Sequence, residues 1–73
     1  MAADSPEDQA ILNFMMSEKE KGKTELSRAE IMRGSGLDYN QLVMALARLE
    51  NTTPPHLARR NRGMASVWEL ANP

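Results

Sequence analysis

Arginines and side-chain amides are the residues of this chain that point most directly to a chemistry. They fall in two groups, one with helical spacing and one near the C-terminus: Asn40, Gln41 and Arg48 in the first, and Arg59, Arg60, Asn61 and Arg62 in the second. A guanidinium binds phosphate oxygens or a guanine edge through a planar fork of donors, and Asn or Gln can form paired hydrogen bonds with adenine. These residue types indicate contacts with nucleic acid.

Catalysis finds little support in the sequence. The chain has no cysteine and one histidine, His56, which lies beside prolines and cannot make a metal or nucleophilic site alone. Residues 34–36 (Gly-Ser-Gly) match neither a dinucleotide fingerprint nor a phosphate loop. We therefore predict no enzyme activity: no catalytic residue, no metal, no cofactor and no small-molecule substrate.

Length and composition predict one small globular domain over residues 1–73, with flexible ends at 1–4 and 71–73. Of the 73 residues, 41% are hydrophobic and 26% are charged, which is typical of a chain with a packed core. No apolar run approaches the length of a membrane span, and the acidic beginning is unlike a secretory signal. We expect a cytoplasmic protein that does not enter a membrane.

The charge is unevenly distributed along the chain. The formal net charge is −1, which argues against binding nucleic acid by bulk attraction. Residues 1–30 carry seven acids and four bases, whereas residues 31–73 carry five arginines and three acids. The positive half is therefore the half that holds the candidate contacts.

Capping signals predict three helices that position these side chains. The first helix begins at Ser5-Pro6 and ends near Gly22. Its apolar residues form a stripe that is expected to face the core: Ile11, Leu12, Phe14, Met15 and Met16. Ser27 and Glu30 form a capping box for a short second helix, which the glycines of residues 34–36 are expected to stop.

The third helix, over residues 38–50, is the most clearly amphipathic one. Asp38 is its expected cap, with Gln41 in the reciprocal position. One side is apolar, namely Tyr39, Leu42, Val43, Leu46 and Leu49, and the other side consists mostly of Asn40, Gln41, Met44, Ala45 and Arg48. The prolines at 54 and 55 prevent the helix from continuing.

After the prolines the pattern alternates, which predicts a β-hairpin. Ser66, Trp68 and Leu70 point to one side of a strand, so that Trp68 and Leu70 close the core. An earlier strand over 56–60 would pair with it through a turn at residues 61–63. The arginines would then cluster at one hairpin tip.

This order of three helices and a hairpin resembles the winged helix-turn-helix family over nearly the whole chain, which implies an α+β fold. The resemblance implies that the third helix lies in a DNA major groove and that the wing touches the backbone. Carried onto this sequence, it places Tyr39, Asn40, Gln41 and Met44 nearest base edges. Arg48 would reach a phosphate or a guanine, and Arg59, Arg60, Asn61 and Arg62 would lie in the phosphate-binding wing.

A narrower, partial resemblance is to winged helices that bind left-handed Z-form nucleic acid. Asn40 and Trp68 sit at suitable positions in the third helix and the wing. Met44 stands where that group has a tyrosine, and the two prolines precede the hairpin instead of flanking Trp68.

Two functions stay open from the sequence. The first is a sequence-specific double-stranded DNA-binding domain of a small transcriptional or mobile-element regulator, located with the nucleoid or nucleus when bound. The alternative is a protein interaction module in a larger assembly, and in either case a homodimer or protein partner is possible. A single positive surface that holds Asn40, Arg48, Arg59 and Arg62 would support DNA binding, and acids that interrupt this surface would weaken that hypothesis. The alternative readings are that the polar side of the helix is merely solvated and that the arginines only protect an edge strand.

Overall fold

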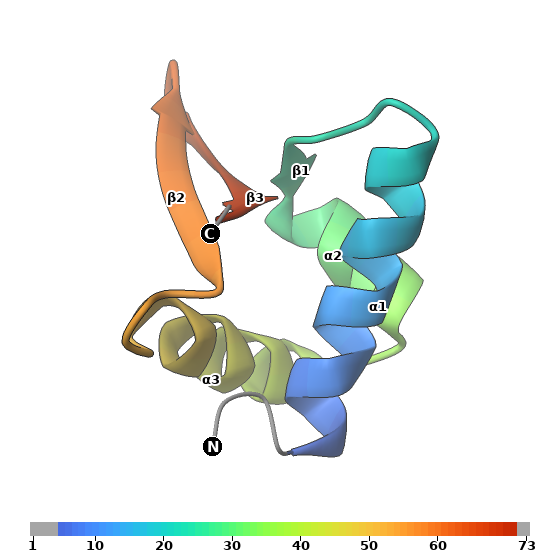
Figure 1. Cartoon of the computed structure of the whole chain (residues 1–73), viewed down its shortest axis with the longest axis vertical. Coiled ribbons are helices and arrows are strands. Elements are labelled where there is room, and N and C mark those ends of the chain that lie inside the picture. Colours follow the sequence, from blue (N-terminus) through green and yellow to red (C-terminus); the bar gives the residue numbers. More distant parts are fainter. Residues whose placement is uncertain (1–4, 72–73) are drawn as a thin grey trace.

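The computed structural model describes residues 5–71 (Figure 1). Its elements are α1 Pro6–Glu20, β1 Leu26–Ser27, α2 Arg28–Ser35, α3 Tyr39–Glu50, β2 Leu57–Arg62 and β3 Ala65–Leu70. Three helices followed by an antiparallel hairpin confirm the predicted α+β class and give the topology of a winged helix. The flexible ends expected at 1–4 and 72–73 lie outside the described residues, whereas the Ala71 amide donates to the His56 carbonyl at 2.9 Å.

The predicted caps begin all three helices. Ser5 Oγ accepts from the Asp8 amide at 3.2 Å, and reciprocal capping boxes join Ser27 with Glu30 and Asp38 with Gln41. Each box satisfies backbone amides that have no partner inside the helix. None of the helices in residues 5–71 is long and apolar enough to cross a membrane.

The sheet contains a third strand that the sequence did not reveal. Leu26 pairs with Trp68 and Ser27 with Val67, which makes β3 the central strand in the order β1-β3-β2. A two-residue strand is too short to show an alternating pattern. Strand β1 matters for function because its pairing with β3 fixes the beginning of α2 against the middle of the hairpin.

The core lies where α1 and α3 meet the sheet. Trp68, Leu57 and Leu26 from the three strands pack there with Ile11, Ile31 and Leu42 from the helices. Three expectations about burial were wrong: Met16 is 53% exposed, while Tyr39 and Val43 lie on the solvent side of α3. Ala45, placed on the polar side from the sequence, is fully buried because its small side chain allows close packing there.

The hairpin turns later than predicted. β2 continues through Asn61 and Arg62, so the turn consists of Gly63 and Met64 instead of residues 61–63. Gly63 has φ of 65°, the left-handed conformation that two-residue hairpin turns require. The two-residue shift places the wing arginines on a strand, where neighbouring side chains point to opposite faces.

Gly34 lies inside α2 and does not stop it. The helix runs to Ser35, and Gly36 ends it with φ of 76°. A Cβ at position 34 would lie 2.2 Å from the ring of Phe14 in α1. Gly34 therefore allows the close approach of α1 and α2.

We expect Gly34→Ala to destabilise the protein, although the same change in an open helix would stabilise it by about 0.5–1 kcal/mol. The Phe14 ring must move, at a cost of about 1–3 kcal/mol for an overpacked contact. Urea unfolding measures the difference. The smaller Phe14→Leu background should remove most of the penalty, and an equal penalty in both backgrounds would exclude the Phe14 contact as its cause.

Glu30 makes the capping box sensitive to acid. Its Oε1 accepts from the Ser27 amide at 2.8 Å and its other oxygen pairs with Lys23. The bond from Lys23, followed by those from Ser27, lowers the pKa of Glu30 to about 2.

Because the folded pKa lies below the unfolded one, this stability is present above pH about 4.5 and is lost as the pH falls toward 2. Glu30→Gln keeps a capping side chain but has no titrating group. Its free energy of unfolding should fall less between pH 4.5 and 2 than that of the wild type. Parallel curves for the two proteins would contradict this assignment.

Candidate nucleic-acid interface

The solvent side of α3 is the first part of the candidate site. Asn40, Met44 and Ala47 lie on it, and Met44 is 62% exposed. The opposite side buries Leu42, Ala45, Leu46 and Leu49 completely or nearly so. Asn40 has no side-chain hydrogen bond among the described residues, so its amide is available to a ligand.

Two of the predicted α3 contacts have other partners. Gln41 Oε1 accepts from the Asp38 amide at 3.1 Å, which ties this side chain to the beginning of its own helix. Arg48 lies toward α1, where Nε and Nη2 both donate to the Asp8 carboxylate and the shortest distance is 2.8 Å. That hydrogen-bonded pair raises the pKa of Arg48 further above its ordinary value.

Asp8 explains the position of Arg48. Its carboxylate is buried, with 5% of the residue exposed, and a buried charge requires a partner. The Arg48 side chain is 45% exposed, so water reaches one side of the guanidinium. Arg48 therefore joins α3 to the first turn of α1, a structural role that the sequence did not indicate.

We expect Arg48→Met, which keeps the length of the side chain, to destabilise the protein by about 1–3 kcal/mol, because Asp8 loses its charged partner. Thermal and urea unfolding measure this. An Asp8→Ala substitution in the Arg48→Met background should recover part of the loss. If Arg48→Met leaves stability unchanged, the pair does not hold α1 to α3.

The hairpin arginines do not form one cluster. Directly paired residues of antiparallel strands share a face, and Arg59 is paired with the buried Trp68. Arg59 therefore points toward α3, where its Nε lies 3.7 Å from Glu50 Oε1. Arg60 and Arg62 point to the opposite, outer face of the hairpin, because neighbouring residues of a strand alternate between its two faces.

Carboxylates occupy the outer face beside Arg60 and Arg62. Arg60 donates to Glu69 at 2.9 Å, and Arg62 donates to the Glu25 carboxylate through both Nε and Nη2. These hydrogen bonds raise the pKa of each arginine, and the bond from Arg62 lowers that of Glu25. Asn40, Arg48, Arg59 and Arg62 therefore do not form the single positive surface expected, because an acid lies beside each of the three arginines. This weakens the case for DNA binding through that surface and leaves α3 and its surroundings as the candidate site.

The structure adds one cation that sequence reasoning missed. Arg28, the first residue of α2, lies 5.5 Å from the centroid of the Trp68 ring and 6.0 Å from that of Tyr39. It has no ion pair in residues 5–71. Only the pairing of β1 with β3 brings it beside the hairpin, so no local sequence signal could have found it.

Arg28 and Arg59 line the same cleft between α3 and the hairpin. This arginine cleft has a volume of about 350 Å³, and its walls include Arg28, Val43, Ala47, Glu50, Arg59 and Trp68. Glu50 lies at the end of α3 and accepts the Trp68 Nε1–H at 2.7 Å. Two guanidinium groups and one carboxylate leave the cleft with a net positive charge.

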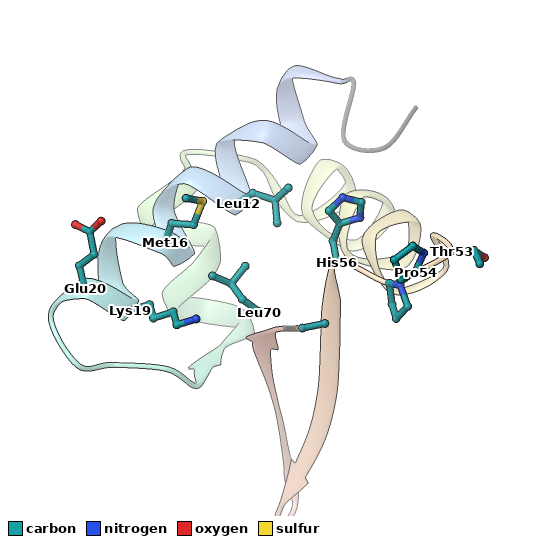
Figure 2. A pocket seen from close by; sticks show the side chains of 10 residues that line it. Leu12, Met16, Lys19, Glu20, Thr53, Pro54, His56 and Leu70 are labelled. Atoms are coloured by element: carbon teal, nitrogen blue, oxygen red, sulfur yellow. The ribbon is translucent and has the colours of Figure 1, made fainter. Parts of the chain in front are cut away.

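A separate apolar groove lies on α1 (Figure 2). It has a volume of about 600 Å³ and shares no lining residue with the arginine cleft. Leu12 and Met16 of α1 face Leu70 and Pro54 across it, with His56 at one side. The His56 Nδ1 lies 2.8 Å from Thr52 Oγ1, and this hydrogen bond helps to hold the one histidine of the sequence in place.

Comparison of the chain with protein-family models, curated proteins and solved structures finds no match. Residues 5–71 also contain no group of three side chains suited to hold a metal ion. The features that bear on function are therefore the solvent side of α3, the arginine cleft and the apolar groove.

Proposed function

We propose that this domain binds double-stranded DNA by inserting the solvent side of α3 into the major groove. The observation that carries the proposal is that Asn40, Met44 and Ala47 form a side of α3 that none of the other described elements covers. A helix has the width of the major groove, where each base pair presents a distinct pattern of donors, acceptors and methyl groups.

The chemistry of this side fits base edges. The Asn40 amide can donate to N7 and accept from N6 of adenine at the same time, while Met44 and Ala47 can pack against thymine methyl groups. Tyr39, 56% exposed, lies at the beginning of the same helix. This combination supports recognition of an A·T-containing site.

The small size of the domain bears on how it could act in the cell. One domain with few phosphate contacts has modest affinity, so specific regulation of transcription or of a mobile element would require a homodimer or a protein partner. The protein would then be found with the nucleoid or nucleus while bound to DNA.

The apolar groove favours a second candidate function, a protein interaction module. Met16 is half exposed beside Leu12 and Pro54, and exposed apolar patches mark interaction sites. The acidic pI of about 5.7 agrees with this alternative. It becomes the preferred function if duplex DNA does not bind.

We expect selection from a library of random duplexes to enrich a defined A·T-containing site. Asn40→Ala should weaken binding to that site by about 5- to 150-fold, equivalent to 1–3 kcal/mol for one bidentate base contact. Binding to unselected duplex should change little, because the substitution removes no charge. Fluorescence anisotropy with the selected and unselected duplexes measures both affinities.

Asn13→Ala provides a matched control, since Asn13 is an exposed asparagine on α1. It should leave both affinities unchanged. If the wild type enriches no sequence, or if Asn40→Ala and Asn13→Ala bind the selected duplex equally well, α3 does not read bases.

A further inference from the structure

We infer that the arginine cleft is a binding site for one DNA backbone segment, in which Arg28 of α2 and Arg59 of β2 hold phosphates on either side of Trp68. The inference rests on the proposed function and deepens it, because it replaces the wing tip with a cleft as the phosphate site. It also assigns a contact to Arg28, which lies outside both groups of candidate residues.

The side chain of Arg28 is preorganised to bind an anion. Its guanidinium rests near the rings of Trp68 and Tyr39, which hold the side chain in place without neutralising its charge. No carboxylate of residues 5–71 lies within ion-pair distance of it. An incoming phosphate would therefore displace no protein partner of Arg28.

Arg59 is the hairpin arginine that can most easily change partner. Its ion pair with Glu50, at 3.7 Å, is longer than those of Arg48, at 2.8 Å, and Arg60, at 2.9 Å. Glu50 already accepts a 2.7 Å hydrogen bond from Trp68, so it keeps a donor when Arg59 turns to a phosphate. The register pairing with Trp68 keeps Arg59 on the side of the sheet that faces α3.

Arg60 and Arg62 are poorly placed for the same task. Strand alternation directs them away from Arg59, and Glu69 and Glu25 hold them through short charge-assisted hydrogen bonds. Binding a phosphate would leave each carboxylate without its partner. These two arginines instead join β2 to β3 and to the segment before β1.

The test is the salt dependence of binding to a 20-base-pair duplex of random sequence, for which base recognition contributes little. The logarithm of the binding constant falls linearly with the logarithm of the salt concentration, and each lost phosphate contact makes this slope less steep by about 0.9. Arg28→Ala and Arg59→Ala should each reduce the slope by about 1, and the double variant by about 2. Circular dichroism and thermal unfolding establish that each variant is folded.

Two controls separate the cleft from general charge effects. Arg33→Ala removes an exposed arginine of the same helix that also has no ion pair in the described residues. The double variant Arg60→Gln, Glu69→Gln removes an outer-face pair without changing the net charge. Both should keep the wild-type slope.

NMR of the wild type gives a readout that needs no variant. Adding the duplex should shift the arginine Nε–H signals of Arg28 and Arg59 and the Trp68 indole signal more than the Nε–H signal of Arg33. Wild-type slopes for both cleft variants, or a larger reduction for the outer-face control, would overturn the cleft while leaving the proposed function intact. A wild type that does not bind duplex at 25 mM salt would overturn both.

Discussion

The position of Trp68 is the constraint on which the rest of the structure depends. Only 2% of this residue is exposed, at the central strand of the sheet, and its Nε1–H donates to Glu50 at the end of α3. A hydrogen bond to a charged acceptor contributes about 1.5–3 kcal/mol, and here it also stabilises an acidic side chain at the unfavourable negative end of a helix. One residue thereby fixes the angle between α3 and the hairpin. The arginine cleft is the space that this angle leaves open.

The period of a β-strand then decides which arginines face that space. Arg59 shares a face with Trp68 because the two residues are register partners, and the neighbouring arginines alternate away from it. Each arginine of the outer face meets a glutamate from another strand or loop. Of the three wing arginines, Arg59 is thus directed at α3, whereas Arg60 and Arg62 hold the sheet together. The charges of these two residues also protect the edge strand β2 from pairing with another chain.

The sequence predicts the elements well because their signals are local. Capping boxes at Ser27 and Asp38, the prolines at 54 and 55 and the alternation around Trp68 each act within a few residues. The helices begin where these signals indicate and the hairpin forms in the predicted segment, although α2 continues past Gly34 and the hairpin turns later than expected. The pairings are long-range and could not be predicted. Asp8 lies forty residues from Arg48, and Arg62 lies thirty-seven residues from Glu25. Knowing that a residue is an arginine does not tell which acid will lie beside it.

The same distinction explains why Arg28 escaped sequence reasoning. Next to the capping serine, it resembles an ordinary solvated residue in the first turn of a helix, where a positive charge is unfavourable. The pairing of Leu26 with Trp68 brings this turn against the hairpin, and the aromatic faces of Trp68 and Tyr39 then offset part of that cost. The charge of Arg28 adds to the positive end of the helix, and no carboxylate of the described residues neutralises it. Both effects raise the electrostatic potential of the cleft. An anionic ligand would relieve this, so the local electrostatics and the proposed phosphate contact point in the same direction.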